Sequence, residues 1–175
     1  MKNNIINATL LSLTIATPAA FAADGTINFV GEITDVACSV DTNSQNLTVT
    51  LGKVASNTFS GIGSKTAPTQ FQLVLKDCPE AATTAVVKFD GTSVAGDNSV
   101  LALTSDVDSA EGVAIEISDA SQQVVKLFEN SQPYTLETGV SSVTNLDFVA
   151  RYKAISDTII AGIANASAQF SITYQ

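Results

Sequence analysis

Apolar and polar residues alternate along the end of this chain, and this alternation limits the possible folds more than any other feature. Every even position from 162 to 174 is small or apolar: Gly162, Ala164, Ala166, Ala168, Phe170, Ile172 and Tyr174. From position 165 onward every odd position is polar. Successive side chains of a β-strand point to opposite faces, so this period of two predicts a strand with one apolar face. The chain ends one residue after Tyr174, and we therefore expect an edge strand without a following strand to cover it.

The same period of two recurs along most of the chain. It predicts strands at residues 47–51, 71–75, 85–89, 100–103, 113–117, 124–128 and 146–154, and the final alternating run predicts one at 164–174. Residues 54–65 are rich in Ser and Gly and carry no regular period, so we expect a loop there. No stretch shows a sustained helical period with caps. Short strands separated by turn residues indicate an all-β, antiparallel sandwich.

The first 22 residues have the parts of a secretory signal peptide. Lys2 supplies the positive charge, residues 5–15 are mostly apolar, and Ala20-Phe21-Ala22 fits the small-residue cleavage site. We therefore predict that residues 1–22 are removed and that the remainder is exported. No later segment is long and apolar enough to cross a bilayer, so we expect no direct membrane insertion.

Cys38 and Cys78 are the only two cysteines. In an exported protein we expect them to be oxidised to each other. They would close a loop of about 40 residues, which the chain-entropy model values at about 4 kcal/mol. A redox pair or a metal site is the alternative, but the wide spacing and the absence of histidine argue against it.

The composition argues against an enzyme. The chain has no histidine, which excludes Ser-His-Asp and Cys-His sites. We interpret Asp106, Asp108 and Glu111, and also Glu116 and Asp119, as solvated charges, and the ligand spacing of a calcium loop is missing. No phosphate loop or dinucleotide fingerprint occurs, so we expect no cofactor. A formal charge of −9 should repel nucleic acid and anionic lipid.

Residues 23–35 form a second amphipathic strand pattern near the start of the exported chain. Ile27, Phe29 and Ile33 share one side with Gly31, whereas the other side is polar except for Val30. The seven residues 27–33 would span roughly 20 Å as a strand. The pattern alone leaves open whether this strand belongs to its own domain or to another one.

Taken together, these features resemble the pilin subunits of chaperone–usher fimbriae, especially the type 1-like rod subunits. The resemblance covers nearly the whole exported chain. It rests on the sequence Gly-Thr-Ile-Asn-Phe-Val-Gly-Glu-Ile at 25–33, the cysteine spacing, Phe-Val-Ala-Arg-Tyr at 148–152, and the ending with Gly162 and a penultimate Tyr174.

The resemblance implies an incomplete immunoglobulin-like sandwich over residues 37–175 that lacks its seventh strand. Residues 23–36 would be a donor-strand extension, with Ile27, Phe29, Gly31 and Ile33 as its inserted face. The alternating residues from Gly162 to Tyr174 would border the groove and be recognised by a periplasmic chaperone. The implied partners are other copies or related pilin subunits, that chaperone and an outer-membrane usher, and the implied location is a cell-surface fimbria reached through the periplasm. Strand addition of this kind is an established form of β-augmentation.

A freestanding, secreted immunoglobulin-like binding module is the alternative. A complete sandwich would be a stable monomer, whereas an incomplete one would aggregate, complement itself or polymerise.

Overall fold

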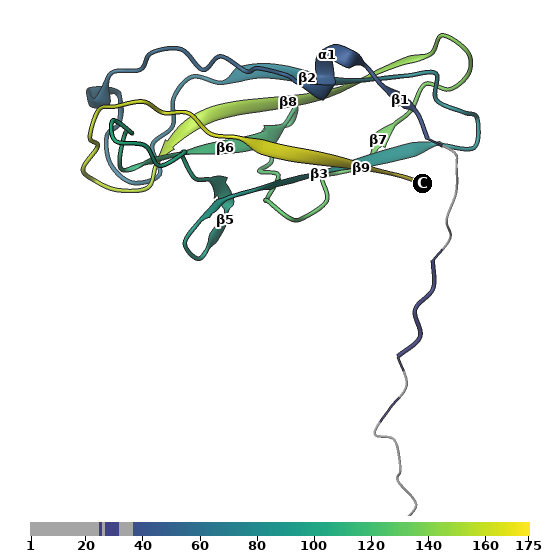
Figure 1. Ribbon diagram of the computed structural model, residues 1–175, viewed down its shortest axis with the longest axis horizontal. Helices are drawn as coiled ribbons and strands as arrows, with labels where there is room; N and C mark the ends of the chain where they lie inside the picture. The colour runs from purple at the N-terminus through teal and green to yellow at the C-terminus, as the bar shows by residue number, and fades with distance from the viewer. Residues whose placement is uncertain (1–24, 26, 32–36) are drawn as a thin grey trace, which may run out of the picture. The chain divides into compact units, whose positions relative to one another are not determined.

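A computed structural model describes residues 25, 27–31 and 37–175, and the chain divides into two units at residues 1–33 and 34–175. The second unit is nearly all β, as the alternation predicts (Figure 1). Its elements are β1 (Ser39–Val40), α1 (Thr42–Gln45), a 3-10 turn (Ser56–Thr58), β2 (Thr69–Lys76), β3 (Thr84–Gly91), β4 (Ser93–Val94), β5 (Asp97–Leu101), β6 (Val113–Asp119), β7 (Tyr134–Thr135), β8 (Val143–Ala154) and β9 (Ala168–Tyr174).

The strands form two antiparallel sheets. The larger sheet has the order β1-β2-β8-β6-β5-β4, and the smaller has the order β7-β3-β9. β8 is the central strand of the larger sheet, paired with β2 on one side and β6 on the other. In Figure 1, β9 runs beside β3 in one layer, and β2, β8 and β6 lie in the other. The expected incomplete sandwich is confirmed, because in the described residues β9 pairs with β3 alone and its second edge carries no strand.

The core lies between the two sheets and is centred on an aromatic cluster. Phe148 of β8 is 1% exposed, and its ring centroid lies 5.1 Å from that of Phe89 on β3. Phe71 of β2 stacks on Phe148 at 5.6 Å. Offset and edge-to-face aromatic pairs stabilise a core beyond the area that they bury. This cluster therefore joins the two sheets at their middle.

Two of the expected strands are wrong. Residues 47–51 keep the alternation, with Val49 and Leu51 packed against the core, but they form no strand because no other described segment pairs with them. Residues 124–128 are irregular, since Val125 N–H donates to Ile117 while Leu127 N–H donates to Asn98, on another strand. Alternation sets the direction of side chains, whereas a strand also needs a hydrogen-bonded neighbour.

Two other strands differ from the expectation in their limits. β5 covers Asp97–Leu101, earlier than the expected 100–103, because it forms a hairpin with β4. β9 begins at Ala168, not at Ala164. The carbonyl of Ala164 accepts a hydrogen bond from the Tyr152 hydroxyl, which ties the segment before β9 to β8 and not to β3.

The expected disulfide between Cys38 and Cys78 is present, and both cysteines are buried. It joins the start of the domain to the end of β2. In the described part of the chain, no helix has the length and apolar character needed to cross a membrane.

Replacing Phe148 by alanine should lower the free energy of unfolding by about 3–5 kcal/mol, because it opens a cavity in the aromatic cluster. Urea unfolding of the exported chain measures the change. Phe128→Ala is the matched control, since Phe128 is 53% exposed and its truncation should change stability by less than about 0.5 kcal/mol. Equal losses from the two substitutions would contradict this view of the core.

Candidate functional site: an uncharged groove beside the last strand

A groove of about 920 Å³ opens between β9 and the segment that follows α1. One lip consists of residues 45–51 and the other of residues 166–170. Core side chains form its floor: Phe71, Leu73, Leu101, Ile115, Ile117 and Ala150. The groove therefore leaves part of the sandwich core accessible from outside, between the edges of the two sheets.

The backbone of the first lip lacks partners. From Asn46 to Val54, no amide or carbonyl forms a backbone hydrogen bond with another described residue. An unpaired backbone group that leaves water costs about as much as a lost hydrogen bond, so such groups are paired in nearly all native structures. Residues 46–51 of this lip and the three residues after it therefore have backbone available to a strand placed beside them.

The start of β9 and the two residues before it supply the second lip, where only part of the alternating set from Gly162 to Tyr174 lies. Ala166, Ala168 and Phe170 line the groove. Ile172 and Tyr174 do not line it but pack, half-buried, against the same core. The Tyr174 hydroxyl donates a 3.4 Å hydrogen bond to the carbonyl of Cys38, and burial raises the pKa of this phenol. The far end of β9 is therefore held beside the disulfide.

Gly162 and Ala164, which belong to the same alternating set, line a separate cavity of about 500 Å³. Gly162 lies against the backbone of the 108–110 loop, and a Cβ at this position would be 2.5 Å from both the Asp108 carbonyl oxygen and the Ala110 nitrogen. Two hydrogen bonds hold this contact: Ile163 N–H donates to Asp108, and Ala110 N–H donates to Ile163. The glycine therefore permits two backbones to approach.

The groove carries no charged side chain among the residues that line it. Its polar lining consists of amides and hydroxyls: Ser44, Gln45, Asn46, Thr48, Ser167 and Gln169. Burying an unpaired charge costs several kcal/mol, so an occupant of this groove should present an uncharged, apolar face.

The exposed apolar residues near the N-terminus have such a face. Ile27 is 78% exposed and Phe29 is 92% exposed, while Val30, on the other side, is 98% exposed. Nothing lies within 4 Å of the position that a Cβ on Gly31 would occupy. Ile33, the fourth expected donor residue, lies outside the described residues. The expected signal peptide, residues 1–22, lies outside them too.

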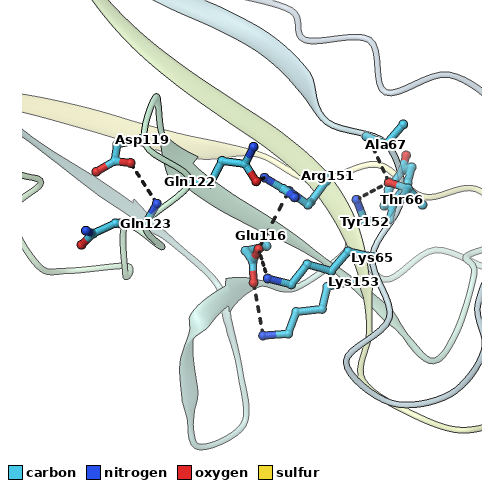
Figure 2. Close-up of polar contacts among 10 residues, drawn as sticks. All are labelled: Lys65, Thr66, Ala67, Glu116, Asp119, Gln122, Gln123, Arg151, Tyr152 and Lys153. Carbon is cyan, nitrogen blue, oxygen red and sulfur yellow. Dashed lines mark hydrogen bonds and ion pairs between the residues drawn. The ribbon is translucent and has the colours of Figure 1, made fainter.

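The interpretation of Glu116 and Asp119 as solvated charges is wrong. Glu116 is 1% exposed, and Lys65 and Lys153 form ion pairs with its carboxylate (Figure 2). Asp119 is 5% exposed and accepts a hydrogen bond from Gln123 N–H. Glu116 alternates with Ile115 and Ile117 along β6, so its side chain lies on the outer face of the larger sheet. The alternation could not show that Lys65, from the loop before β2, and Arg151 and Lys153 of β8 cover that face.

Sequence reasoning also missed the first lip, because it assigned residues 47–51 to a strand of the sandwich. The signal that could have revealed the lip is that no neighbouring strand pairs with this segment. That signal can be recognised only when the sheet topology is known. No group of acidic or sulfur ligands in the described part of the chain could hold a metal ion.

Comparisons with known proteins show what the chain is similar to. It matches the family model described as fimbrial protein over residues 27–175. It is 37% identical to long polar fimbria protein A of Salmonella typhimurium, over 95% of this chain and 94% of that protein. It is 37% identical to the fimbrial subunit type 1 of Salmonella typhimurium, with 100% of both chains covered.

Solved structures give the same picture. A type I fimbria protein of Burkholderia pseudomallei is 38% identical with a TM-score of 0.61, and the match covers 81% of this chain and 91% of that one. The P pilus rod subunit PapA shares the fold, with a TM-score of 0.64 at 22% identity over 79% of this chain and 99% of that one.

Replacing Gly162 by alanine should destabilise the domain by about 1–3 kcal/mol, because the added methyl group pushes two backbone segments apart. Urea unfolding measures the change. Gly25→Ala is the control, since a Cβ there meets nothing within 4 Å. An unchanged midpoint for Gly162→Ala would show that the contact with the 108–110 loop does not need a glycine.

Proposed function

The chain belongs to the fimbrial protein family, and from this premise we propose that its copies assemble into a cell-surface fimbria by donor-strand exchange. Residues 23–36 of one subunit insert into the groove of the next. Ile27, Phe29, Gly31 and Ile33 form the inserted face. The chain is then a structural component, and its chemistry is that of strand pairing.

The unpaired backbone between Asn46 and Val54 is the observation that carries this proposal. An inserted strand pairs with this lip on one side and with the free edge of β9 on the other. Each backbone hydrogen bond contributes about 0.5–1.5 kcal/mol net, so a strand of seven residues gains several kcal/mol from pairing alone. An extended segment completes the sandwich in this way without any change of fold.

Complementary side chains support the same occupant. The groove is uncharged and apolar at its floor, and residues 26–31 carry no charge. Ile27 and Phe29 are exposed before insertion, and full burial stabilises such a side chain by about 1.5–3 kcal/mol. Gly31 has no side chain, so the proposal puts it where the groove is too shallow to receive one.

An open groove also implies partners before assembly. An apolar groove beside a free strand edge promotes aggregation. A periplasmic chaperone that fills it with a strand of its own would prevent this, and an outer-membrane usher would exchange that strand for the donor segment of another subunit. The signal peptide at 1–22 directs the chain to that compartment, where the disulfide between Cys38 and Cys78 forms. A freestanding module would instead be a complete sandwich, whose last strand is paired on both sides.

Replacing Phe29 by aspartate should abolish fibres or shorten them severely, because the groove offers no partner for a buried charge. Electron microscopy of cells that express the variant with its assembly partners measures fibre number and length. Val30→Asp is the matched control: Val30 lies on the opposite side of the same segment, and its variant should form fibres of ordinary length.

Normal fibres from Phe29→Asp, or equal defects in both variants, would contradict the proposed donor face. Deleting residues 23–35 should give a subunit that still binds a chaperone but donates to no neighbour. Copurification with the chaperone shows that this truncated subunit folds.

A further inference from the structure

Three of the eight basic residues of the chain gather around one buried carboxylate on the outer face of the larger sheet (Figure 2). Lys65 Nζ lies 2.7 Å from Glu116 Oε1, and Lys153 Nζ lies 3.3 Å from Oε2. Arg151 Nε lies 4.0 Å from Oε1. We call these four residues the basic cluster. Three cations against one carboxylate leave it with a net charge of +2, in a chain whose net charge is −9.

Some polar atoms in and beside the basic cluster have no hydrogen-bond partner within the subunit. Ser118 Oγ and Arg151 Nε are buried without a hydrogen-bond partner, and the buried Glu116 Oε2 has only its ion pair with Lys153 at 3.3 Å. The side chains of Lys65 and Lys153 are 38% and 23% exposed. An ammonium group has three donors, so both lysines retain donors that can face a partner.

Asp97 also lies within the influence of the basic cluster. Hydrogen bonds from Ser99 lower the pKa of Asp97, and the charge of Lys153 lowers it further. This carboxylate is therefore ionised, and counting it still leaves an excess of positive charge beside the buried Glu116. That excess favours an anionic group from outside the subunit.

The chain itself carries a matching acidic surface. The 105–111 loop exposes Asp106, Asp108 and Glu111, and none of them forms an ion pair with a described residue. The loop is held in one shape: Ser109 Oγ accepts from Asp106 N–H at 2.7 Å and donates to Thr104 at 2.8 Å. Such a preformed loop loses little conformational entropy on binding.

We propose that the basic cluster is the docking site for the 105–111 loop of a second copy of this chain in the fimbria. This inference rests on the proposed assembly into fibres. Asp106 and Asp108 of the loop meet Lys65 and Lys153. Val107, which is fully exposed at the loop tip, meets Ile62, which is 66% exposed and lies three residues before Lys65.

A second copy of the chain fits this site better than any other anion for two reasons: its acidic loop has the opposite charge, and the same contact can repeat from copy to copy. Removal of Lys2 with the signal peptide takes the formal charge of each copy from −9 to −10, so copies repel one another, and contacts between surfaces of opposite sign offset this repulsion. Since the two surfaces differ and each copy carries both, the contact is heterologous, and repeating it builds a helical filament. The contact would thus accompany the inserted strand without sharing a residue with it.

Zero-length carbodiimide cross-linking of intact fibres tests the proposal, because it joins only amines and carboxylates in direct contact. Boiling separates subunits that are not covalently joined, and mass spectrometry of the covalent dimer identifies the peptides. We expect the peptide of the 105–111 loop joined to Lys65 or Lys153. The internal control is the cross-link between Lys126 and Glu129, whose charged atoms lie 3.9 Å apart within one subunit.

Charge-exchange variants add a second measurement. Lys65→Glu should remove most of the dimer cross-link, and the double variant Lys65→Glu/Asp108→Lys should restore it with amine and carboxylate exchanged. Arg151 and Lys153 still pair Glu116 in these variants. Lys88→Glu, on β3 in the other sheet and 39% exposed, is the matched control and should leave the cross-link unchanged.

Dimers joined through other peptides only, with the internal control present, would overturn this inference and leave donor-strand exchange intact. So would fibres that bind sulfated saccharides through Lys65 and show no such dimer. Ordinary fibres from the Phe29→Asp variant would instead refute the proposed assembly itself.

Discussion

Backbone hydrogen bonding is the constraint on which the rest of this structure depends. A sandwich strand needs two neighbours or one neighbour and water, and β9 has only β3 beside it in the described residues. Opposite β9, residues 46–54 run without a backbone partner. The side chains between these two lips already belong to the core. The domain is therefore folded around a position that an added strand can occupy.

The surroundings of the first lip hold it in place. Asp41 caps α1 by accepting from Asn43 N–H, and a hydrogen bond to Lys76 lowers the pKa of Asp41. Ser44 of the same helix accepts a hydrogen bond from Val74 N–H on β2. With the disulfide between Cys38 and Cys78, these contacts attach both ends of the preceding turn to the larger sheet. A groove whose lip is held in this way needs little ordering when a strand enters.

The alternation of apolar and polar residues predicted most of the strands well, but it predicted poorly which segments lie beside one another. The strands around Phe148 and Ile115 follow from a period of two, because each strand buries one face between the sheets. The same rule wrongly predicted a strand at residues 47–51. The alternation shows where side chains point, but it does not show which backbone segment lies beside them. Glu116 is a similar case. Its place on a strand was predicted, but its burial depends on Lys153 of β8 and on Lys65, which reaches it from the loop before β2. The candidate groove therefore needed both the resemblance and the topology.

Hydrogen exchange of the backbone amides between Asn46 and Val54 tests the central claim most directly. The exported subunit is compared before assembly and within fibres, by mass spectrometry of peptides from the lip. The subunit should be studied with residues 23–35 deleted, so that it offers no strand to itself. We predict fast exchange of these amides in the free subunit and strong protection of the inward-facing ones in fibres, while β8 stays protected in both. Amides already protected in the free truncated subunit, or still exchanging fast in fibres, would contradict the account.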